Sequence, residues 1–297
     1  MDYNKPALDL NNQLAMLQAR GLSIANLDEA KIFLDNVSYF RFAAYLRVFE
    51  QDPVAHQYRN GTTFEMAAEL YLFDAELRKL LFGAIQKIEI ALRSRIIHEF
   101  SLAHGAFWFI DESLAVDKHK FAENLSTFER ELQRTKEEFI KDHYTKYSLL
   151  GLPPAWKMLE LISFGCLTKL YFDFADTPAK KRIARSFGVK QQEALESWMK
   201  AVNALRNACA HHSRVWNRRM AVKPQLLQKP VGKWINNKEA VPYRLYAIIS
   251  CIAYWLNSID TRNTFVMDLK VLFSKYPSVN PSAMGFPEAW NQQPLWK

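Results

Sequence analysis

Apolar residues recur at three- and four-residue steps along most of the chain, which is the spacing of one face of an α-helix. The clearest case runs from Phe64 to Phe100, where leucine and isoleucine keep this spacing throughout. Phe82 and Ile90 fall on other faces, so the segment is apolar nearly all round. Such a helix is expected in the middle of a helical bundle.

The same periodicity predicts further helices, over residues 26–51, 118–147, 151–174, 190–217, 241–259 and 263–276. Asn26 or Asp28 suits the capping position of the first, and Pro154 suits the first turn of the third. The alternation of apolar and polar residues that marks half-buried strands is nearly absent. The sequence therefore predicts an all-α fold built around an up-and-down bundle.

No internal repeat, low-complexity segment or sharp change of composition divides the chain. We expect one domain over residues 1–276, followed by a tail, residues 277–297, that docks through its tryptophans. The longest apolar stretch, "YAIISCIAYWL", has about half the length of a bilayer span and is expected to be a buried helix. The N-terminus has no apolar signal core, which favours a cytoplasmic protein without membrane contact.

The formal net charge of +8 favours an anionic partner, with nucleic acid first and a membrane surface second. A basic, solvated surface without a partner explains the charge equally well. Two groups of residues are the candidates for phosphate contacts: Lys180, Lys181, Arg182 and Arg185, and then Arg214, Arg218 and Arg219. The three cysteines are far apart and none is in a CxxC pair, so we expect no metal and no cofactor.

The stretch "NALRNACAHHSRVWNRR" places an arginine and two adjacent histidines at the end of a helical pattern, in a chain with only seven histidines. At about 100° per residue, one face of this helix is apolar: Leu195, Trp198, Met199, Val202, Leu205 and Cys209. Arg206 falls within that stripe, where a cation is unfavourable unless it is paired or faces a polar cleft. Glu89, or another carboxylate of the 64–100 helix, is the candidate partner.

Asn207 and His211 lie four residues apart on the flank of the stripe, so their side chains can meet. A histidine moves protons near neutral pH, and an arginine presents a fixed fork of donors to phosphate oxygens. Together they suit RNA cleavage by the RNA's own 2′-hydroxyl, without a metal. The alternative is a purely structural role, with a core histidine and a buried ion pair, since an Arg-x4-His spacing is short and common by chance.

The segment "RNACAH", Arg206 to His211, resembles the signature of HEPN ribonucleases, in which Arg is followed by Asn, His or Lys and, after three more residues, by His. The rest of the chain resembles the abortive-infection (Abi, AbiD/AbiF-like) proteins of bacterial phage defence. The stretches that carry this resemblance cover most of the chain: "KPALDLNNQLAMLQARGL", "VSYFRFAAYLRVFE", "TFEMAAELYLFDAELRKLLFGAIQKIEIALRSRIIHEF", "GLPPAWKMLELISFGCLTKLY" and "MGFPEAWNQQPLW".

The resemblance implies a HEPN-like helical bundle that dimerises, so that two Arg–His motifs face one composite site. It also implies a toxin-like ribonuclease held in check until phage infection, with a small RNA as a candidate antitoxin. Arg206, Asn207 and His211 are the catalytic candidates. Two rival hypotheses remain: a non-catalytic module that binds RNA, including a small regulatory RNA, and a helical bundle that binds only proteins.

Arg93 and His98 repeat the Arg-x4-His spacing on the 64–100 helix and form a secondary candidate motif. Ser94 follows this arginine, which is a weaker match to the signature than Asn207. Glu89 stands four residues before Arg93, where it can pair with it along the helix. We interpret this second motif as structural, with a second half-site in the same chain as the alternative.

Overall fold

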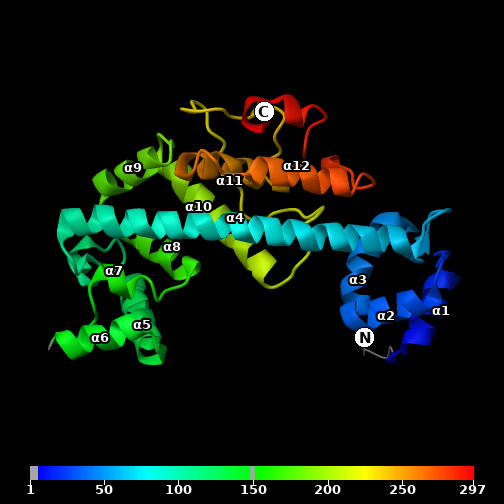
Figure 1. Ribbon diagram of the computed structural model, residues 1–297, viewed down its shortest axis with the longest axis horizontal. Helices are drawn as coiled ribbons and strands as arrows, with labels where there is room; N and C mark the ends of the chain where they lie inside the picture. Colours follow the sequence, from blue (N-terminus) through cyan, green and yellow to red (C-terminus); the bar gives the residue numbers. More distant parts are fainter. Residues whose placement is uncertain (1–5, 148–150) are drawn as a thin grey trace. The chain divides into compact units, whose positions relative to one another are not determined.

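The structure is all-α, as the sequence predicts. The computed structural model describes residues 6–147 and 151–297 (Figure 1). Within these residues, the only sheet is a two-stranded antiparallel hairpin. Residues 1–5 and 148–150 of the predicted domain lie outside the described residues.

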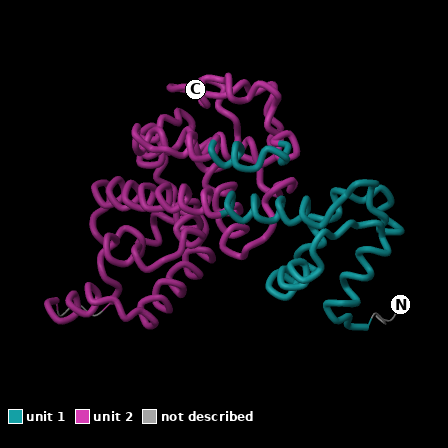
Figure 2. Tube along the Cα trace, turned by 45° about the vertical axis from the view of Figure 1, so that its right-hand side comes forward, with its two compact units in different colours: residues 1–78, 271–280 teal, residues 79–270, 281–297 magenta. Residues whose placement is uncertain are grey.

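The chain divides into two compact units (Figure 2). Unit 1 comprises residues 1–78 and 271–280, and unit 2 comprises residues 79–270 and 281–297. This division does not coincide with the predicted boundary after residue 276, because most of the predicted tail belongs to unit 2. The single domain over residues 1–276 therefore stays a prediction.

Unit 1 contains short helices, the hairpin and the beginning of one long helix. Its elements are α1 (Leu10–Ala19), α2 (Leu27–Val37), α3 (Tyr39–Leu46), the 3₁₀ turn η1 (Arg47–Phe49), β1 (Glu50–Asp52), β2 (Gln57–Tyr58) and the first part of α4 (Phe64–His104).

The predicted helix over residues 26–51 is two helices, because Ser38 interrupts it. Ser38 has a φ of 67°, a left-handed conformation that an α-helix cannot contain. Its N–H still donates to the Leu34 carbonyl, and its hydroxyl accepts from the Arg41 N–H, so Ser38 ends α2 and begins α3. The predicted cap at the start is confirmed, since the Asn26 side chain accepts from the Asp28 and Glu29 N–H groups.

Unit 2 contains the rest of α4 and nearly all later elements. They are η2 (Trp108–Ile110), η3 (Glu112–Leu114), α5 (Lys118–Arg134), α6 (Glu138–Lys146), α7 (Ala155–Met158), α8 (Phe164–Asp173), α9 (Thr177–Ser186), α10 (Gln192–Ala210), α11 (Leu245–Ile259), the start of α12 (Phe265–Lys275), η4 (Pro281–Met284), η5 (Trp290–Gln292) and η6 (Pro294–Trp296).

Two further predicted helices are also broken by side chains that bond to the backbone. In the segment 118–147, the Thr135 hydroxyl accepts from the Glu137 N–H, and α5 ends before it. In the segment 151–174, the Ser163 hydroxyl accepts from the Cys166 N–H and starts α8. Serine and threonine offer the backbone a local partner outside the helix, which explains both breaks.

The core of unit 2 is formed around α10 and α11. All residues of α11 from Leu245 to Leu256 are buried, which confirms the prediction of a buried helix for "YAIISCIAYWL". Helix α10 packs against α8, α9 and α11. The Trp198 ring of α10 stacks on Trp234 and contacts Tyr254 of α11 edge to face. These contacts fix the helix that carries the Arg206–His211 motif.

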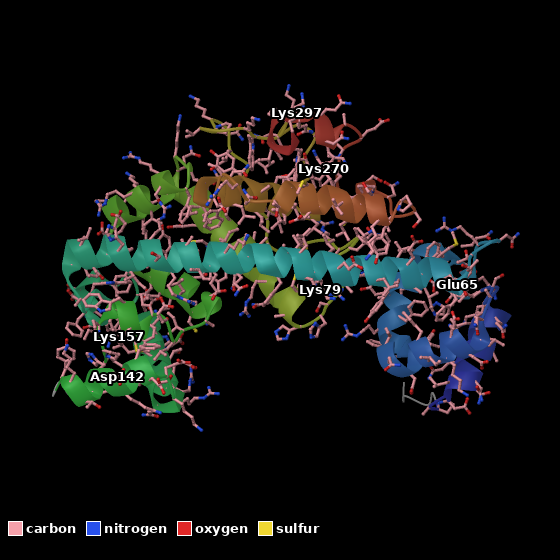
Figure 3. The ribbon with its side chains drawn as sticks, viewed as in Figure 1. Glu65, Lys79, Asp142, Lys157, Lys270 and Lys297 are labelled. Carbon is pink, nitrogen blue, oxygen red and sulfur yellow. The ribbon has the colours of Figure 1, made fainter. Side chains whose placement is uncertain are left out.

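The C-terminal residues contact unit 2 through aromatic side chains. Trp296 is fully buried, stacks on Tyr246 of α11 and donates its ring N–H to the Tyr246 hydroxyl over 3.1 Å. Lys270, labelled in Figure 3, donates to the Trp296 carbonyl oxygen over 2.5 Å. Gly285 has a φ of 88°, and a Cβ there would lie 2.5 Å from the Arg244 Cβ, so this turn requires glycine.

Candidate functional site

Helix α10 presents the predicted apolar stripe to the core of unit 2. All six residues of the stripe are buried: Leu195, Trp198, Met199, Val202, Leu205 and Cys209. Because α10 packs against α8, α9 and α11, the end of α10 has a fixed position. The side chains that follow Leu205 are therefore placed by the packing of the whole helix.

Arg206 lies half-buried beside an aromatic ring instead of a carboxylate. Its guanidinium carbon is 5.6 Å from the centre of the Phe82 ring of α4, and its Nε atom is buried without a hydrogen-bond partner. No carboxylate lies within ion-pair distance of it among the described residues. The predicted partnership with Glu89 is wrong, since that carboxylate bonds Arg93 over 3.1 Å.

The positive charge of Arg206 is not balanced by an anion among the described residues. A cation that loses part of its hydration is unfavourable unless charge or hydrogen bonds replace the water. The Phe82 ring supplies a weak cation–π contact only. A phosphate oxygen is the ligand that would satisfy both the charge and the orphaned Nε–H.

The helix ends at Ala210, so the prediction that it continues to residue 217 is wrong. The His212 N–H donates to the Cys209 carbonyl over 3.0 Å, and the Ser213 N–H donates to the Ala208 carbonyl over 2.9 Å. This pair of bonds is a Schellman ending, whose first residue beyond the cap takes a left-handed conformation. His212 fills that position with a φ of 54°, where glycine is usual.

His211 is the C-cap residue, directly after the last helical residue Ala210, and is exposed to solvent. Its N–H donates to the Asn207 carbonyl over 2.9 Å, so the backbone holds it one turn beyond Asn207. Asn207 is also exposed, and no hydrogen bond joins the two side chains among the described residues. The motif therefore places a half-buried arginine and a solvent-facing imidazole about one and a half helical turns apart.

The arginine of the secondary motif is held by ion pairs, one of which is the predicted pair with Glu89. The Arg93 guanidinium bonds the Glu89 carboxylate over 3.1 Å, the Glu160 carboxylate over 3.4 Å and the Ile162 carbonyl over 2.9 Å. His98 is exposed. The Arg93 Nε atom is buried without a partner, like that of Arg206, so the two arginines differ in the carboxylates that balance the charge of Arg93.

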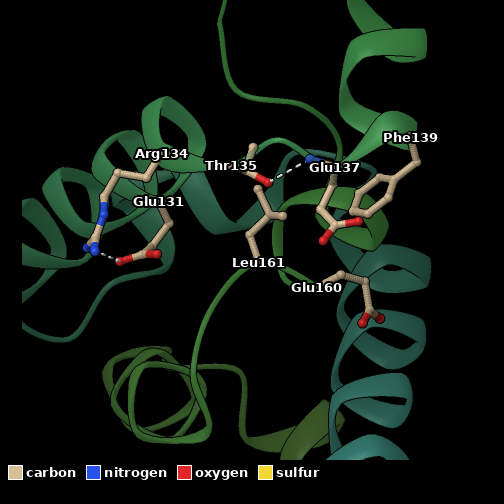
Figure 4. A pocket seen from close by; sticks show the side chains of 7 residues that line it. All are labelled: Glu131, Arg134, Thr135, Glu137, Phe139, Glu160 and Leu161. Atoms are coloured by element: carbon tan, nitrogen blue, oxygen red, sulfur yellow. Dashed lines mark hydrogen bonds and ion pairs between the residues drawn. The ribbon is translucent and has the colours of Figure 1, made fainter.

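A shallow cavity beside Glu160 is also a poor place for RNA (Figure 4). It has a volume of about 590 Å³, and its lining includes Glu131, Glu137 and Glu160 against a single arginine, Arg134. Arg134 is itself directed to Glu131 at 3.6 Å. The excess of carboxylates repels phosphate.

The first basic group divides into buried and exposed members. Lys180 is only 6% exposed, lies 3.7 Å from the Glu196 carboxylate and sits over the Tyr171 ring. Burial lowers the pKa of this lysine, although Glu196 opposes the shift. Its proposed role in RNA contact is therefore corrected, because its ammonium group faces the interior. Arg182 pairs with Glu99 over 2.6 Å.

The members that remain available are Lys181 and Arg185 on α9, and Arg218 and Arg219 after the motif, all exposed. Arg214 is half-buried and engaged with other groups. The Arg219 guanidinium covers the Tyr243 ring at 4.4 Å, and the Lys223 ammonium lies 6.0 Å from the same ring. The contacts of Phe82, Tyr243 and Lys223 could not be predicted from the sequence, because they form only where the folded loop and the helices meet.

Within the described residues, no group of three histidine, cysteine or acidic side chains is arranged to hold a metal ion. Of the helices formed by those residues, none is both long enough and apolar enough to cross a bilayer.

The chain matches the family of Abi-like proteins over residues 32–217, a segment that includes the long helix α4 and the Arg206–His211 motif. Because the match covers more than half of the chain, the protein belongs to the Abi-like family. Membership suggests a role in abortive-infection phage defence. Comparisons with curated protein sequences and with solved structures gave no match.

Proposed function

We propose that this protein is a metal-independent endoribonuclease of abortive-infection defence, which cleaves RNA by attack of the RNA's own 2′-hydroxyl. The observation that supports the proposal most strongly is Arg206, a half-buried guanidinium without a carboxylate, about one and a half helical turns from the exposed His211. A structural arginine would be expected to have found its counterion inside the fold, as Arg93 does.

The chemistry assigns each group a role. His211 accepts the proton of the 2′-hydroxyl, or returns one to the departing 5′-oxygen. The 2′-oxygen forms a bond to phosphorus as the 5′-oxygen leaves, and the product strand ends in a cyclic phosphate. Arg206 stabilises the extra negative charge on the phosphorane-like transition state. The Asn207 carbonyl accepts the His211 N–H and so holds the backbone of His211.

The test is incubation of the purified protein with RNA in the presence of EDTA. The proposal expects cleavage, cyclic phosphate ends and no reaction where the cut site carries a 2′-deoxy sugar. RNA that shifts without being cut would favour the alternative of a non-catalytic module, including one that binds a small regulatory RNA. Neither binding nor cleavage would favour a bundle that binds only proteins.

Binding should depend on salt, since the exposed cations Lys181, Arg185, Arg218 and Arg219 would each neutralise a phosphate. With four such contacts to a single strand, the affinity should fall roughly 50-fold between about 50 and 200 mM salt. The double variant Lys181→Glu with Arg185→Glu should flatten this dependence, measured by fluorescence anisotropy. The matched control is Lys180→Met, the buried neighbour, which should leave the salt dependence unchanged. Affinity that is insensitive to salt contradicts an electrostatic surface.

The proposed active form is a homodimer in which α4 packs against α4 of a second copy. Helix α4 leaves Phe82 and Ile90 exposed by 39% and 57%, and a Cβ on Gly83 between them would meet nothing within 4 Å. Phe82 also contacts Arg206, so a two-fold contact on this face would bring the two motifs together.

Ile90→Asp should therefore convert the dimer into a monomer and reduce cleavage, because it places a charge in an apolar contact. Size-exclusion chromatography with light scattering measures the mass. Leu102→Asp is the matched control: Leu102 is 73% exposed on another face of the same helix, and its replacement should change neither mass nor cleavage. An Ile90→Asp protein that stays dimeric and active contradicts the α4 interface.

A further inference from the structure

A cavity in unit 1, distant in sequence from the Arg–His motif, combines features that suit a nucleotide. Helix α1 forms one wall, α3 and η1 form a second, and the β1–β2 hairpin closes it. Its volume is about 610 Å³, within the range of cavities that hold small ligands.

Three aromatic side chains line this cavity. Tyr58 is buried and Tyr39 is half-buried, while Phe40 leaves 88% of its surface to solvent. An aromatic ring so exposed is unfavourable in water. Beside a cavity, it offers a flat face on which a planar group can stack, and every nucleobase has such a face.

Two guanidinium groups reach the same cavity. Arg20 donates to the Tyr39 hydroxyl over 3.0 Å, and Arg47 is exposed. Neither has a carboxylate within ion-pair distance in the described part of the chain. The acidic residue of the cavity, Glu50, is bonded to His56 over 3.0 Å. The two arginines are therefore available to an oxyanion, and their planar forks match the geometry of a phosphate.

A buried acceptor completes the lining. Gln13 donates to the Leu8 carbonyl over 2.8 Å, whereas its Oε1 atom is buried without a hydrogen-bond partner. A buried polar atom without a partner is unfavourable, so a ligand N–H would stabilise it. Every standard nucleobase carries an N–H donor on its pairing edge. Burial raises the pKa of Tyr58 to about 12, although Arg20 opposes the shift.

We propose that this cavity binds one nucleoside phosphate unit: Phe40 stacks on the base, Gln13 accepts from the base edge, and Arg20 and Arg47 hold the phosphate. The unit is either an unpaired nucleotide of an RNA strand or a free mononucleotide. Stacking and a shared N–H donor distinguish poorly among bases, so the site should accept all of them. The site does not depend on RNA cleavage, because all of its residues belong to unit 1.

Isothermal titration calorimetry of the full chain with AMP tests this assignment. AMP should bind, while adenosine, which lacks the phosphate, and ribose 5-phosphate, which lacks the base, should each bind at least tenfold more weakly. Adenosine cannot bond the arginines through a phosphate, and ribose 5-phosphate has no base to stack on Phe40. Titrations use the His211→Ala protein, so that an RNA ligand is not cut by the proposed chemistry. No heat from either AMP or a short single strand at millimolar concentration overturns the proposal.

Phe40→Ala and Arg47→Ala are the variants, because both side chains are exposed and their loss leaves the packing intact. Each should weaken AMP binding by at least about fivefold, the effect of losing one stacked ring or one phosphate contact. Ile32→Ala and Lys31→Ala are the matched controls, exposed residues of the same unit outside the cavity lining. Unchanged affinity in Phe40→Ala and Arg47→Ala overturns the assignment, even if AMP binds the protein.

The source of the nucleotide is read from a second titration with an unpaired tetra-adenylate. If the strand binds more tightly than AMP and loses that gain in Phe40→Ala, the cavity holds one nucleotide of an RNA. If AMP binds as tightly as the strand, the cavity holds a free nucleotide. Failure of RNA cleavage affects neither result, so the two proposals are tested separately.

Discussion

His211→Ala is expected to abolish RNA cleavage and leave the fold intact. The imidazole is exposed at the end of α10, so its removal costs little packing. If it transfers the proton of the 2′-hydroxyl, its loss should slow cleavage by a factor of about 10² to 10⁴. The measurement is the single-turnover rate on a labelled RNA, with the melting temperature recorded in parallel.

The neighbouring histidine offers a matched control. His212→Asn removes an imidazole but keeps a residue that tolerates the left-handed conformation found there. This variant should cleave at a rate close to that of the parent protein. Asn207→Ala should have a smaller effect than His211→Ala, because the carbonyl that accepts the His211 N–H remains and the two side chains share no hydrogen bond. An undiminished rate for His211→Ala would refute the assignment, and a rate lost on His98→Ala instead would move the active site to α4.

The helical content of the chain was predictable because it depends on local spacing. The α10 stripe shows this well: positions 195, 198, 199, 202, 205 and 209 follow the helical repeat, and all of them are buried. Arg206 could be singled out from the sequence because it interrupts this apolar pattern. The periodicity could not show where each helix ends. Ser38 and His212 adopt left-handed conformations that few residues other than glycine favour, and no pattern of hydrophobicity records them.

Contacts between distant segments account for the other differences. Lys180 belongs to a run that reads as a basic surface, yet it is buried because α9 packs against α10, which carries Glu196. Glu89 seemed equally able to pair with Arg93 or Arg206 by its position on α4. In the structure, the Glu89 carboxylate pairs with Arg93, and the Phe82 ring lies beside Arg206. Such choices depend on the relative rotation of two helices, which one sequence does not contain.

Arg206→Met is expected to abolish cleavage without destabilising the protein. Loss of a group that stabilises transition-state charge should slow the reaction by about 10² to 10³. Methionine keeps the apolar contact with Phe82 and removes the orphaned Nε–H, whose burial costs about 1–3 kcal/mol. The cation–π contact that is lost contributes only about 0.5–1 kcal/mol. The free energy of unfolding should therefore stay the same or rise by up to about 2.5 kcal/mol, with roughly 2–4 °C in melting temperature for each kcal/mol.

The corresponding variant of the second motif, Arg93→Met, should destabilise the protein and leave RNA cleavage unchanged. Arg93→Met leaves the half-buried Glu89 and the Ile162 carbonyl without their donor, so it should lower the free energy of unfolding by about 1–2 kcal/mol. Its cleavage rate, measured below its melting temperature, should stay close to that of the parent protein. Thermal unfolding and single-turnover cleavage of the two variants decide between the motifs. If Arg93→Met is folded but inactive while Arg206→Met still cleaves, the catalytic arginine is on α4. If Arg206→Met is strongly destabilised, the guanidinium is a structural group and its missing counterion is not an RNA phosphate.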